Sequence, residues 1–398
     1  MMNIENGTVI SRANWSFPTA VRFGAGRSRE IPDVCTTVGI RRPLLVTDRD
    51  LAALPMTQET LDACRAAGLG VNLFAEVHGD PTGSDIEAGV TAFRSLDCDG
   101  VIALGGGSAL DVGKAVAFMS GQDLPIWDFE DVGDNYRRAR EDGIAPVIAV
   151  PTTAGTGSEV GRAAVITDEG AQVKKIIFHP RMMPRVAVLD PCLTVSLPPT
   201  LTAATGMDAL AHALEAYCAS GFHPLADGIA LEGIRLVKDF LHRAYADGND
   251  LEARACMLAA AAMGATAFQK GLGAVHALSH PIGALNHVHH GLTNAVLLPY
   301  VLVSNRPAIE LRIAASARYM NLPDSSFIGF IAWLLELREM LGIPDTLAEL
   351  GVGHDQVNRI AEMAARDPSG GNNPVTVGAP ELDGICRRAI EGRLGMPR

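Results

Sequence analysis

Residues 101–114 read Val-Ile-Ala-Leu-Gly-Gly-Gly-Ser-Ala-Leu-Asp-Val-Gly-Lys, and this stretch decides how the first half of the chain folds. An apolar run that ends in three glycines predicts a strand and a tight turn, and the residues after it predict a helix. Ser108, with Asp111 three residues later, is typical of a capped helix start. The bare amides of that start would face an anion, and a pyrophosphate is the ligand that suits them.

The glycine turn differs from two common phosphate-binding loops. It is not a P-loop because Ser108 stands where the first glycine would be, and it is not G-x-G-x-x-G because Leu110 replaces the last glycine. Three glycines can also serve only as a tight strand-to-helix turn. A second loop, PTTAGTGSE at 151–159, follows another apolar run and combines hydroxyls with glycines. Two such loops at one sheet edge indicate one long ligand.

The first half of the chain alternates short apolar runs with amphipathic stretches, as repeated strand and helix units of a parallel sheet do. Most runs end in turn or capping residues, which places the ligand edge of the sheet there. Asp48 closes the first run, where its carboxylate can accept hydrogen bonds from a ribose diol or cap the next helix, and both interpretations stay open. The predicted strands are 43–47, 71–77, 100–104, 146–150 and 186–189.

The pattern of apolar residues changes after Asp190, where PCLTVSLPPT forms a proline-rich linker. Beyond it, apolar residues recur at helical spacing and strand-like runs are missing. We therefore expect an α/β domain over 1–190 and an all-helical domain over 191–398. The predicted helices of the second domain are 201–220, 225–245, 251–268, 273–287, 308–319, 325–341, 354–366 and 379–391.

Composition excludes several classes of protein. A chain of 398 residues has room for two or three domains, and its net charge of −12 without any basic run argues against nucleic acid as a partner. The seven scattered cysteines favour reduced thiols in a cytoplasm. The N-terminal stretch has no leader pattern, and the longest apolar run, 256–268, is shorter than the roughly 20 residues of a membrane span. We expect a cytoplasmic protein that neither is exported nor spans a membrane.

Two pairs of residues in the helical half have the spacing of metal ligands. Asp208 and His212 lie four residues apart, and so do His276 and His280, so each pair shares one helix face. Carboxylate oxygen and imidazole nitrogen together suit iron(II) or zinc, whereas calcium would require several carboxylates. An unpaired imidazole in such apolar surroundings would be costly. A divalent transition metal is therefore the favoured occupant.

A third histidine cluster, His287, His289 and His290, follows the second pair. In a continuous helix His287 would lie about 16 Å from His276, at roughly 1.5 Å per residue, which is too far to share one ion. His290 stands just before Gly291 and can fold back once the helix has ended.

Taken together these segments resemble the iron-containing alcohol dehydrogenase family, from about residue 14 to residue 392. The resemblance implies a dinucleotide-binding α/β domain with a mostly parallel sheet, an all-α C-terminal domain, and a metal in the cleft between them, a two-domain plan shared with dehydroquinate synthase. The segments that carry it, in family order, are LLVTD, GGGSALDVGKA, PTTAGTGSE, VAVLDP, TGMDALAHALEAY and HALSHPIG followed by HHG.

The resemblance also implies roles for individual residues. His280 would lie near the metal as a proton-relay group, and Asp48 matches the position associated with a preference for NAD over NADP. The implied metal ligands are Asp208, His212, His276 and His290. The implied cofactor residues, besides Asp48, are Gly106, Gly107, Ser108, Thr153, Thr156 and Lys175.

Three positions depart from the family pattern. His289 stands where many members have proline, so it could compete for the metal or be only a neighbour, and we favour His290 as the ligand. Lys270 precedes the second histidine pair, where it could bind a substrate carboxylate or be a solvated surface lysine. The stretch Asn372-Asn-Pro374 has no cysteine beside it.

These observations predict an NAD-dependent, metal-dependent alcohol dehydrogenase or aldehyde reductase. It would transfer hydride between nicotinamide and a small primary alcohol, diol or hydroxy acid, with iron(II), or zinc in its place, as the metal, and act as a homodimer or larger homo-oligomer. One alternative is a metal-independent oxidoreductase like maleylacetate reductase, against which all four metal-ligand candidates argue. Another is a lyase like dehydroquinate synthase, against which the scarcity of basic residues around the histidine motifs argues. A non-enzymatic metal- or nucleotide-binding module is the third.

Overall fold

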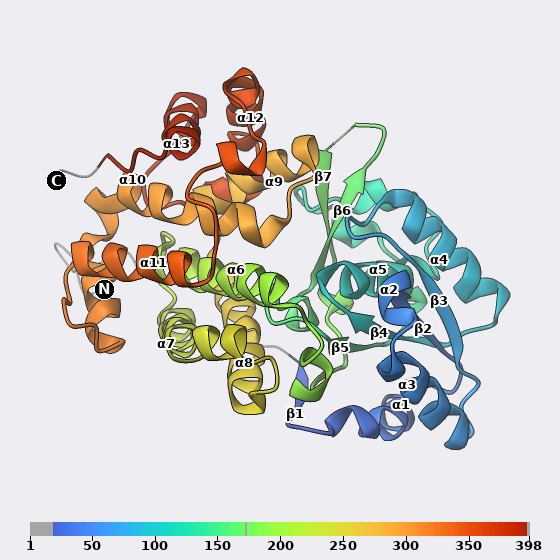
Figure 1. Cartoon of the computed structure of the whole chain (residues 1–398). Helices are drawn as coiled ribbons and strands as arrows, with labels where there is room; N and C mark the ends of the chain where they lie inside the picture. The colour runs from blue at the N-terminus through green and yellow to red at the C-terminus, as the bar shows by residue number, and fades with distance from the viewer. Residues whose placement is uncertain (1–18, 172, 396–398) are drawn as a thin grey trace, which may run out of the picture.

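The computed structural model describes residues 19–171 and 173–395, and the chain forms a sheet-containing half followed by a helical half (Figure 1). Residues 1–18, on which the prediction about a leader sequence rests, lie outside the described residues. The main sheet has six strands in the order β1-β8-β5-β4-β2-β3, and every pair of neighbours is parallel. Its strands are β1 (Ala20–Phe23), β2 (Pro43–Asp48), β3 (Asn72–Val77), β4 (Gly100–Gly105), β5 (Val147–Pro151) and β8 (Val186–Leu189).

The predicted fold class is confirmed, and all five predicted strands are strands of this sheet. β1 was missed because it is short, lies at the edge of the sheet and leaves its side chains largely exposed, so its sequence shows no buried apolar run. Helices cover both faces. α1 (Ile31–Val38) and α3 (Pro55–Ala66) pack on one face, and α4 (Gly83–Ser95) and α5 (Gly107–Met119) pack on the other.

Alternate residues of β2, β4, β5 and β8 enter different cores, which explains why these strands read as continuous apolar runs. Leu44 and Val46 pack with α4 and α5, whereas Leu45 between them packs with α1 and α3. The strand order reverses at β2, because the chain leaves β2 for β3 on one side and returns to β4 on the other. Ligands bind in the crevice outside the carboxyl ends of two such strands. Here those ends are Asp48 and Gly105.

The start of α5 differs from the predicted capping. The N-cap residue is Gly106, and the Ser108 hydroxyl donates a hydrogen bond to the Gly79 carbonyl at 2.7 Å. Asp111 accepts from the Val165 amide at 2.9 Å and from the Ser158 hydroxyl. The predicted capping pair is therefore wrong, because both side chains bond to neighbouring segments.

A two-stranded antiparallel hairpin, β6 (Ala163–Asp168) and β7 (Val173–Phe178), stands apart from the main sheet. Most of its side chains are only half-buried, and two lysines interrupt β7, so neither strand has the apolar pattern that predicts one. The hairpin reaches across to α9 (Ala274–Asn286) of the helical half (Figure 1). It is thus one of the bridges between the two halves.

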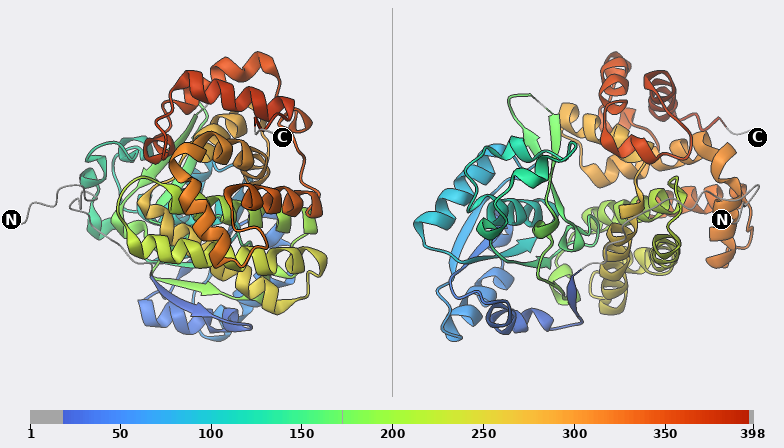
Figure 2. Two further views of the ribbon diagram at one scale, coloured as in Figure 1. Left: turned by 90° about the vertical axis from the view of Figure 1, so that its left-hand side faces the viewer. Right: turned by 180° about the vertical axis from the view of Figure 1, so that it is seen from behind.

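The helical half is built around α6 (Pro199–Cys218), which packs against α7, α8 and α10 and is buried on nearly all sides (Figure 2). The last sheet strand ends at Leu189 and α6 begins at Pro199, and we retain a domain boundary near Asp190 as a proposal. Besides α6 and α9, the helices are α7 (Pro224–Ala246), α8 (Leu251–Ala267), α10 (His290–Tyr319), α11 (Phe327–Met340), α12 (Val357–Ala364) and α13 (Ala379–Glu391); the sheet half also has the short α2 (Arg49–Ala52).

α10 is much longer than predicted. The prediction covered only 308–319, whereas the helix begins at His290 and contains Pro299 and Pro307. The first half of α10 is buried on almost all sides, so its apolar residues do not recur at helical spacing. The two prolines are typical of helix ends, which also argued against a continuous helix.

One stretch, Leu251–Lys270, has the length and hydropathy of a membrane-spanning helix, although 56% of its most apolar window is buried inside the structure. It consists of α8 and the 3-10 turn η8 (Phe268–Lys270), and α8 packs against α6 and α7. A core helix of a helical domain has the same composition.

Candidate functional site

α6 carries three ionisable side chains on one face, Asp208, His212 and Glu215, and all three are buried. Their spacing of four and then three residues places them in line along the helix. Burial of such groups without partners would cost several kcal/mol each, roughly. The surrounding segments must therefore supply hydrogen bonds or a cation.

The junction of α9 and α10 brings His290 to this face. α9 ends at Asn286, His287 takes the left-handed conformation with φ of 54°, and α10 begins at His290. Gly291 lies so close to α6 that a Cβ atom there would be 2.3 Å from the Ala204 carbonyl oxygen. This close approach, possible only for glycine, leaves His290 Nε2 3.7 Å from Asp208 Oδ1.

Asp208, His276 and His290 form a group whose ligand atoms all lie within 4.8 Å of one another. His212 lies at the edge of it, with Nε2 4.0 Å from Asp208 Oδ1 and its ring stacked on His276 at 4.6 Å between centroids. His289 is exposed and is not a member of this group among the described residues. The structure thus brings three of the four implied ligands into direct reach and the fourth next to them.

The side chain of Asn294 marks the point where these atoms converge. Its Nδ2 group donates to Asp208 Oδ1 at 2.7 Å and lies 3.1 Å from His290 Nε2 and 3.3 Å from His276 Nε2. One donor group therefore faces three acceptors, which is the arrangement that a positive charge would satisfy better. His212 Nδ1 is buried without a hydrogen-bond partner in the described part of the chain.

Glu215 orients His276 from behind. Its Oε2 lies 2.6 Å from His276 Nδ1, and its Oε1 accepts a hydrogen bond from the Val275 amide at 2.7 Å. Burial raises the pKa of Glu215 to about 7, although the hydrogen bonds from backbone amides oppose this. With Nδ1 held by a carboxylate, His276 presents Nε2 to the ligand group, which is the usual second contact of a metal-binding histidine.

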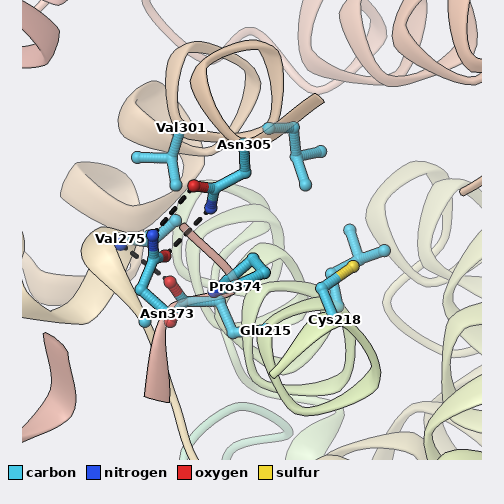
Figure 3. Close-up of a pocket in the computed structure, with 10 residues that line it drawn as sticks. Glu215, Cys218, Val275, Val301, Asn305, Asn373 and Pro374 are labelled. Carbon is cyan, nitrogen blue, oxygen red and sulfur yellow. Dashed lines mark hydrogen bonds between the residues drawn. The ribbon is translucent and has the colours of Figure 1, made fainter. Parts of the chain in front are cut away.

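Asn373 anchors the same helix start from the C-terminal end of the chain (Figure 3). Its Oδ1 accepts from the Ala274 amide at 3.1 Å, and its side chain exchanges two hydrogen bonds with Asn305, at 2.8 and 2.9 Å. A cavity of about 10 Å³ lies beside them, which is room for about one water molecule. The Asn-Pro motif thus has a structural role in placing His276.

The residues of this group fit a divalent iron or zinc ion. Burial, with the neighbouring imidazoles, lowers the pKa of both His276 and His290 well below the usual value, so both rings are neutral at pH 7. Neutral imidazoles beside a carboxylate are the ligand set that these metals bind. The side chain of His290 is 31% exposed, which opens the group toward solvent.

His280 lies beside this group and is held by a residue that the sequence did not indicate. Its Nδ1 lies 2.8 Å from Asp367 Oδ2, and its ring stacks on His290 at 5.6 Å. His280, Asp367 and Lys175 line a cavity of about 160 Å³ between the hairpin and the C-terminal segment. Lys175 pairs there with Asp168 at 3.1 Å. The cavity therefore joins the sheet half to the histidine cluster.

The two glycine-containing loops lie against each other at the sheet edge, as predicted. A Cβ atom on Gly107 would lie 2.6 Å from Thr156 Cγ2, and one on Gly106 would lie 3.4 Å from Thr153 Cγ2. Lys114 of α5 donates to the carbonyls of Ser158 and Ala163 and so ties the second loop to α5. The first-turn amides of α5, which have no acceptor within the helix, lie in this corner.

Asp48 caps the short helix α2 by accepting from the Leu51 amide at 2.8 Å through Oδ1. This is the second of the two interpretations left open, and it leaves Oδ2 for a ligand at the crevice. Ser108 keeps its backbone amide in the first turn of α5, but its hydroxyl is committed to Gly79.

Lys270 lies in neither predicted setting. It is buried, and its Nζ donates to Asp227 Oδ1 at 2.6 Å and to the Tyr217 carbonyl at 3.1 Å. Both alternatives, a contact to a substrate carboxylate and a solvated surface lysine, are therefore wrong. The ion pair with a residue of α7 ties the turn before α9 to the core.

Four residues of the site are absent from the sequence prediction, and they differ in whether a sequence pattern could have indicated them. Glu215 could have been found, since it continues the face of Asp208 and His212. Asn294 lies one helical turn after His290, so a helix predicted to begin at His290 would also have placed Asn294 on the same face. Asp367 and Asn373 come from distant segments and leave no local signal.

Comparisons with known proteins cover nearly the whole chain. Residues 18–191 match the family model described as iron-containing alcohol dehydrogenase, and residues 202–390 match the Fe-containing alcohol dehydrogenase family, C-terminal. The chain is 40% identical over 384 residues to a 4-hydroxybutyrate dehydrogenase of Cupriavidus necator, covering 94% of this chain and 97% of the relative.

Two solved structures have the same architecture. A 1,3-propanediol oxidoreductase is 34% identical with a TM-score of 0.90, covering 96% of this chain and all of its own. A sulfoacetaldehyde reductase from Bifidobacterium kashiwanohense in complex with NAD+ is 31% identical with a TM-score of 0.86, covering 96% of this chain and 99% of its own.

The contact between Glu215 and His276 predicts a loss of metal affinity in Glu215→Gln. The amide can donate to His276 Nδ1, which moves the ring proton to Nε2 and blocks it as a ligand, so affinity should fall about 10- to 100-fold. Metal content after dialysis against a chelator measures this, with apo-protein unfolding midpoints as a check on folding. Glu362→Gln, at an exposed site on α12, is the control, and equal metal retention by both variants would contradict the role.

The packing of the two loops predicts that Gly107→Ala weakens dinucleotide binding by about tenfold, because an overpacked contact typically costs 1–3 kcal/mol. Removing the opposing methyl in Gly107→Ala/Thr156→Ser should restore part of the affinity. Fluorescence titration with NADH gives the dissociation constants, with Thr156→Ser alone as the reference. A double variant no better than Gly107→Ala would show that this collision is not the cause.

Proposed function

The chain belongs to the iron-containing alcohol dehydrogenase family, and on that premise we propose which of its residues carry out the reaction. It is an oxidoreductase that transfers hydride between a nicotinamide cofactor and small alcohols or aldehydes. The observation that carries the assignment of residues is the convergence of Asp208, His276 and His290 beside the cavity that His280 lines. A metal-independent oxidoreductase and a lyase are not favoured.

We assign the metal to Asp208, His212, His276 and His290. When bound there, iron(II) or zinc supplies Lewis acidity that favours ionisation of a substrate hydroxyl. Glu215 keeps Nε2 of His276 turned toward the ion, and Gly291 lets His290 approach α6 closely. Asn294 donates to Asp208 Oδ1 and so fixes the orientation of that carboxylate. The burial of the group keeps bulk water away from three of the four ligands.

We assign the cofactor to the crevice at the carboxyl ends of β2 and β4. The amides of Gly106, Gly107 and Ser108 at the start of α5 suit the pyrophosphate, and the threonine hydroxyls of the second loop, Thr153 and Thr156, would line it. Asp48 would accept hydrogen bonds from the adenosine ribose and disfavour a 2′-phosphate, which supports NAD over NADP. Lys175 lines the cavity where the nicotinamide end would reach His280.

We assign proton transfer to His280. The carboxylate of Asp367 holds its Nδ1 at 2.8 Å, which leaves Nε2 to take the proton of the alcohol or return it to an aldehyde. Burial alone would raise the pKa of Asp367, but the hydrogen bond from His280 lowers it below its usual value. Asp367 is therefore ionised at neutral pH and stabilises the protonated ring.

A cytoplasmic location and a homo-oligomer complete the proposal. All seven cysteines are free in the structure, which suits a reducing compartment. The edge strand β1 leaves Val21 and Phe23 42% and 46% exposed, and an exposed apolar edge strand is a natural contact for a second copy.

The test of the proposed function is NADH formation from ethanol, 1-butanol, 1,2-propanediol, 1,3-propanediol and 4-hydroxybutyrate. Metal-stripped enzyme is reconstituted separately with iron(II) and zinc, and NADP is compared with NAD. We expect turnover that depends on metal and prefers NAD. Turnover without metal would overturn the ligand assignment, a preference for NADP would overturn the role of Asp48, and no turnover with either metal would overturn the activity.

His280→Gln tests the proton-transfer role. Oxidation at neutral pH should fall about 100-fold or more, since positioned general bases contribute about that much. Higher pH or added imidazole should recover part of the rate, while metal content and NADH affinity stay unchanged. His354→Gln is the control, because His354 is half-exposed and contacts Glu391 rather than any residue of the proposed site. A uniform loss at all pH values without rescue would argue for a structural role.

A further inference from the structure

Six charged side chains and His280 line the 160 Å³ cavity, and most of them neutralise one another or a neighbour. Lys174 pairs with Asp80 at 2.9 Å, and Lys175 pairs with Asp168 at 3.1 Å and lies 3.6 Å from Glu130. In these contacts the charges of both lysines are already paired. They leave little net positive charge for a ligand.

Asp367 is similarly engaged. It accepts from the Ser369 amide at 2.9 Å besides its contact with His280. Its neighbour Arg366, at the end of the α12 segment, is exposed and makes no ion pair or side-chain hydrogen bond within residues 19–171 and 173–395. Arg366 is therefore a cation on the cavity wall whose charge the protein leaves unmatched.

The position of Arg366 relates it directly to the reaction. It is adjacent in sequence to the residue that holds His280, and His280 stacks on the metal-ligand candidate His290 at 5.6 Å. With the nicotinamide end against the hairpin wall at Lys175, a substrate whose hydroxyl lies at the metal group would extend its far end toward the opposite wall, which Arg366 lines. A guanidinium there can bind a carboxylate through two parallel hydrogen bonds.

We propose that Arg366 is a specificity-determining residue that binds the carboxylate of an ω-hydroxy acid or its semialdehyde. The inference rests on the proposed function and adds the substrate class to it. It also replaces Lys270, which the sequence offered for this role but which is paired with Asp227 in the core.

Asp131 is the other charged residue of the cavity without an ion pair among the described residues. Burial raises the pKa of its carboxyl, and the Arg162 guanidinium acts against that shift. It lies between α5 and β5, where its amide donates to the Ile176 carbonyl of β7, whereas Arg366 adjoins Asp367 and His280. A cationic alcohol would select Asp131, so the two ligand chemistries can be distinguished experimentally.

The experiment compares kcat/KM of the metal-loaded enzyme for 4-hydroxybutyrate and 1,4-butanediol, which have equal chain length. The wild type should prefer the acid. Arg366→Gln should lower the acid-to-diol ratio tenfold or more, because a charged hydrogen-bond partner is lost. Arg366→Lys should keep part of it. Arg359→Gln on exposed α12 makes the same change in net charge and should leave the ratio unchanged.

A binding measurement makes the test independent of turnover. Butyrate carries the carboxylate without the reacting hydroxyl, so in the presence of NADH it should bind the wild type and Arg359→Gln but bind Arg366→Gln at least tenfold more weakly. Choline, a cationic alcohol, is assayed beside them as the probe for Asp131. Equal losses for acid and diol, an altered NADH affinity as the main effect, or a wild-type preference for the diol or for choline would each overturn the proposal. Failure of 1,4-butanediol oxidation with butyrate binding intact would instead reject the proposed function and leave the carboxylate site standing.

Discussion

The burial of ionisable groups in α6 is the constraint on which the helical half depends. Asp208, His212 and Glu215 lie on a helix that has no other Asp, Glu, His, Lys or Arg, and all three are buried away from bulk water. Burial of this kind is tolerated only when every polar atom has a partner. The starts of α9 and α10 supply partners for Glu215 and Asp208, whereas His212 Nδ1 has none among the described residues. The buried carboxylates of α6 therefore constrain where α9 and α10 begin.

The geometry of those helix starts is correspondingly strict. Glu215 receives the Val275 amide and His276 Nδ1 through its two oxygens, and Asn373 receives the Ala274 amide. The first turn of α9 is thus held by side chains from α6 and from the C-terminal segment. A mutation far from the histidines in sequence can therefore disturb the metal site through the backbone of this turn.

Hydride transfer requires the nicotinamide and the alcohol to lie next to each other. In the proposed arrangement the sheet half binds the cofactor and the helical half binds the alcohol. The hairpin β6–β7 lies between the sheet half and α9 of the helical half (Figure 1). Beside it lies the 160 Å³ cavity that His280 lines. Residues of both halves line that cavity. Because its paired charges belong to the scaffold, a single unpaired cation such as Arg366 can decide which alcohol is accepted without altering the chemistry.

The parallel sheet, the helical second half and the pairs Asp208/His212 and His276/His280 could all be predicted from the sequence, because each depends on periodicity within a short segment. The ends of β2 and β4 were equally readable from Asp48 and Gly105. The hairpin, the edge strand β1 and the first half of α10 could not be predicted, since their side chains are either half-exposed or buried all round and show no period. Three facts became visible only in the folded chain: Asp367 holds His280, Lys270 pairs with Asp227 in the interior, and Arg366 has no ion pair among the described residues. Those facts depend on contacts between residues tens of positions apart, where local spacing carries no information.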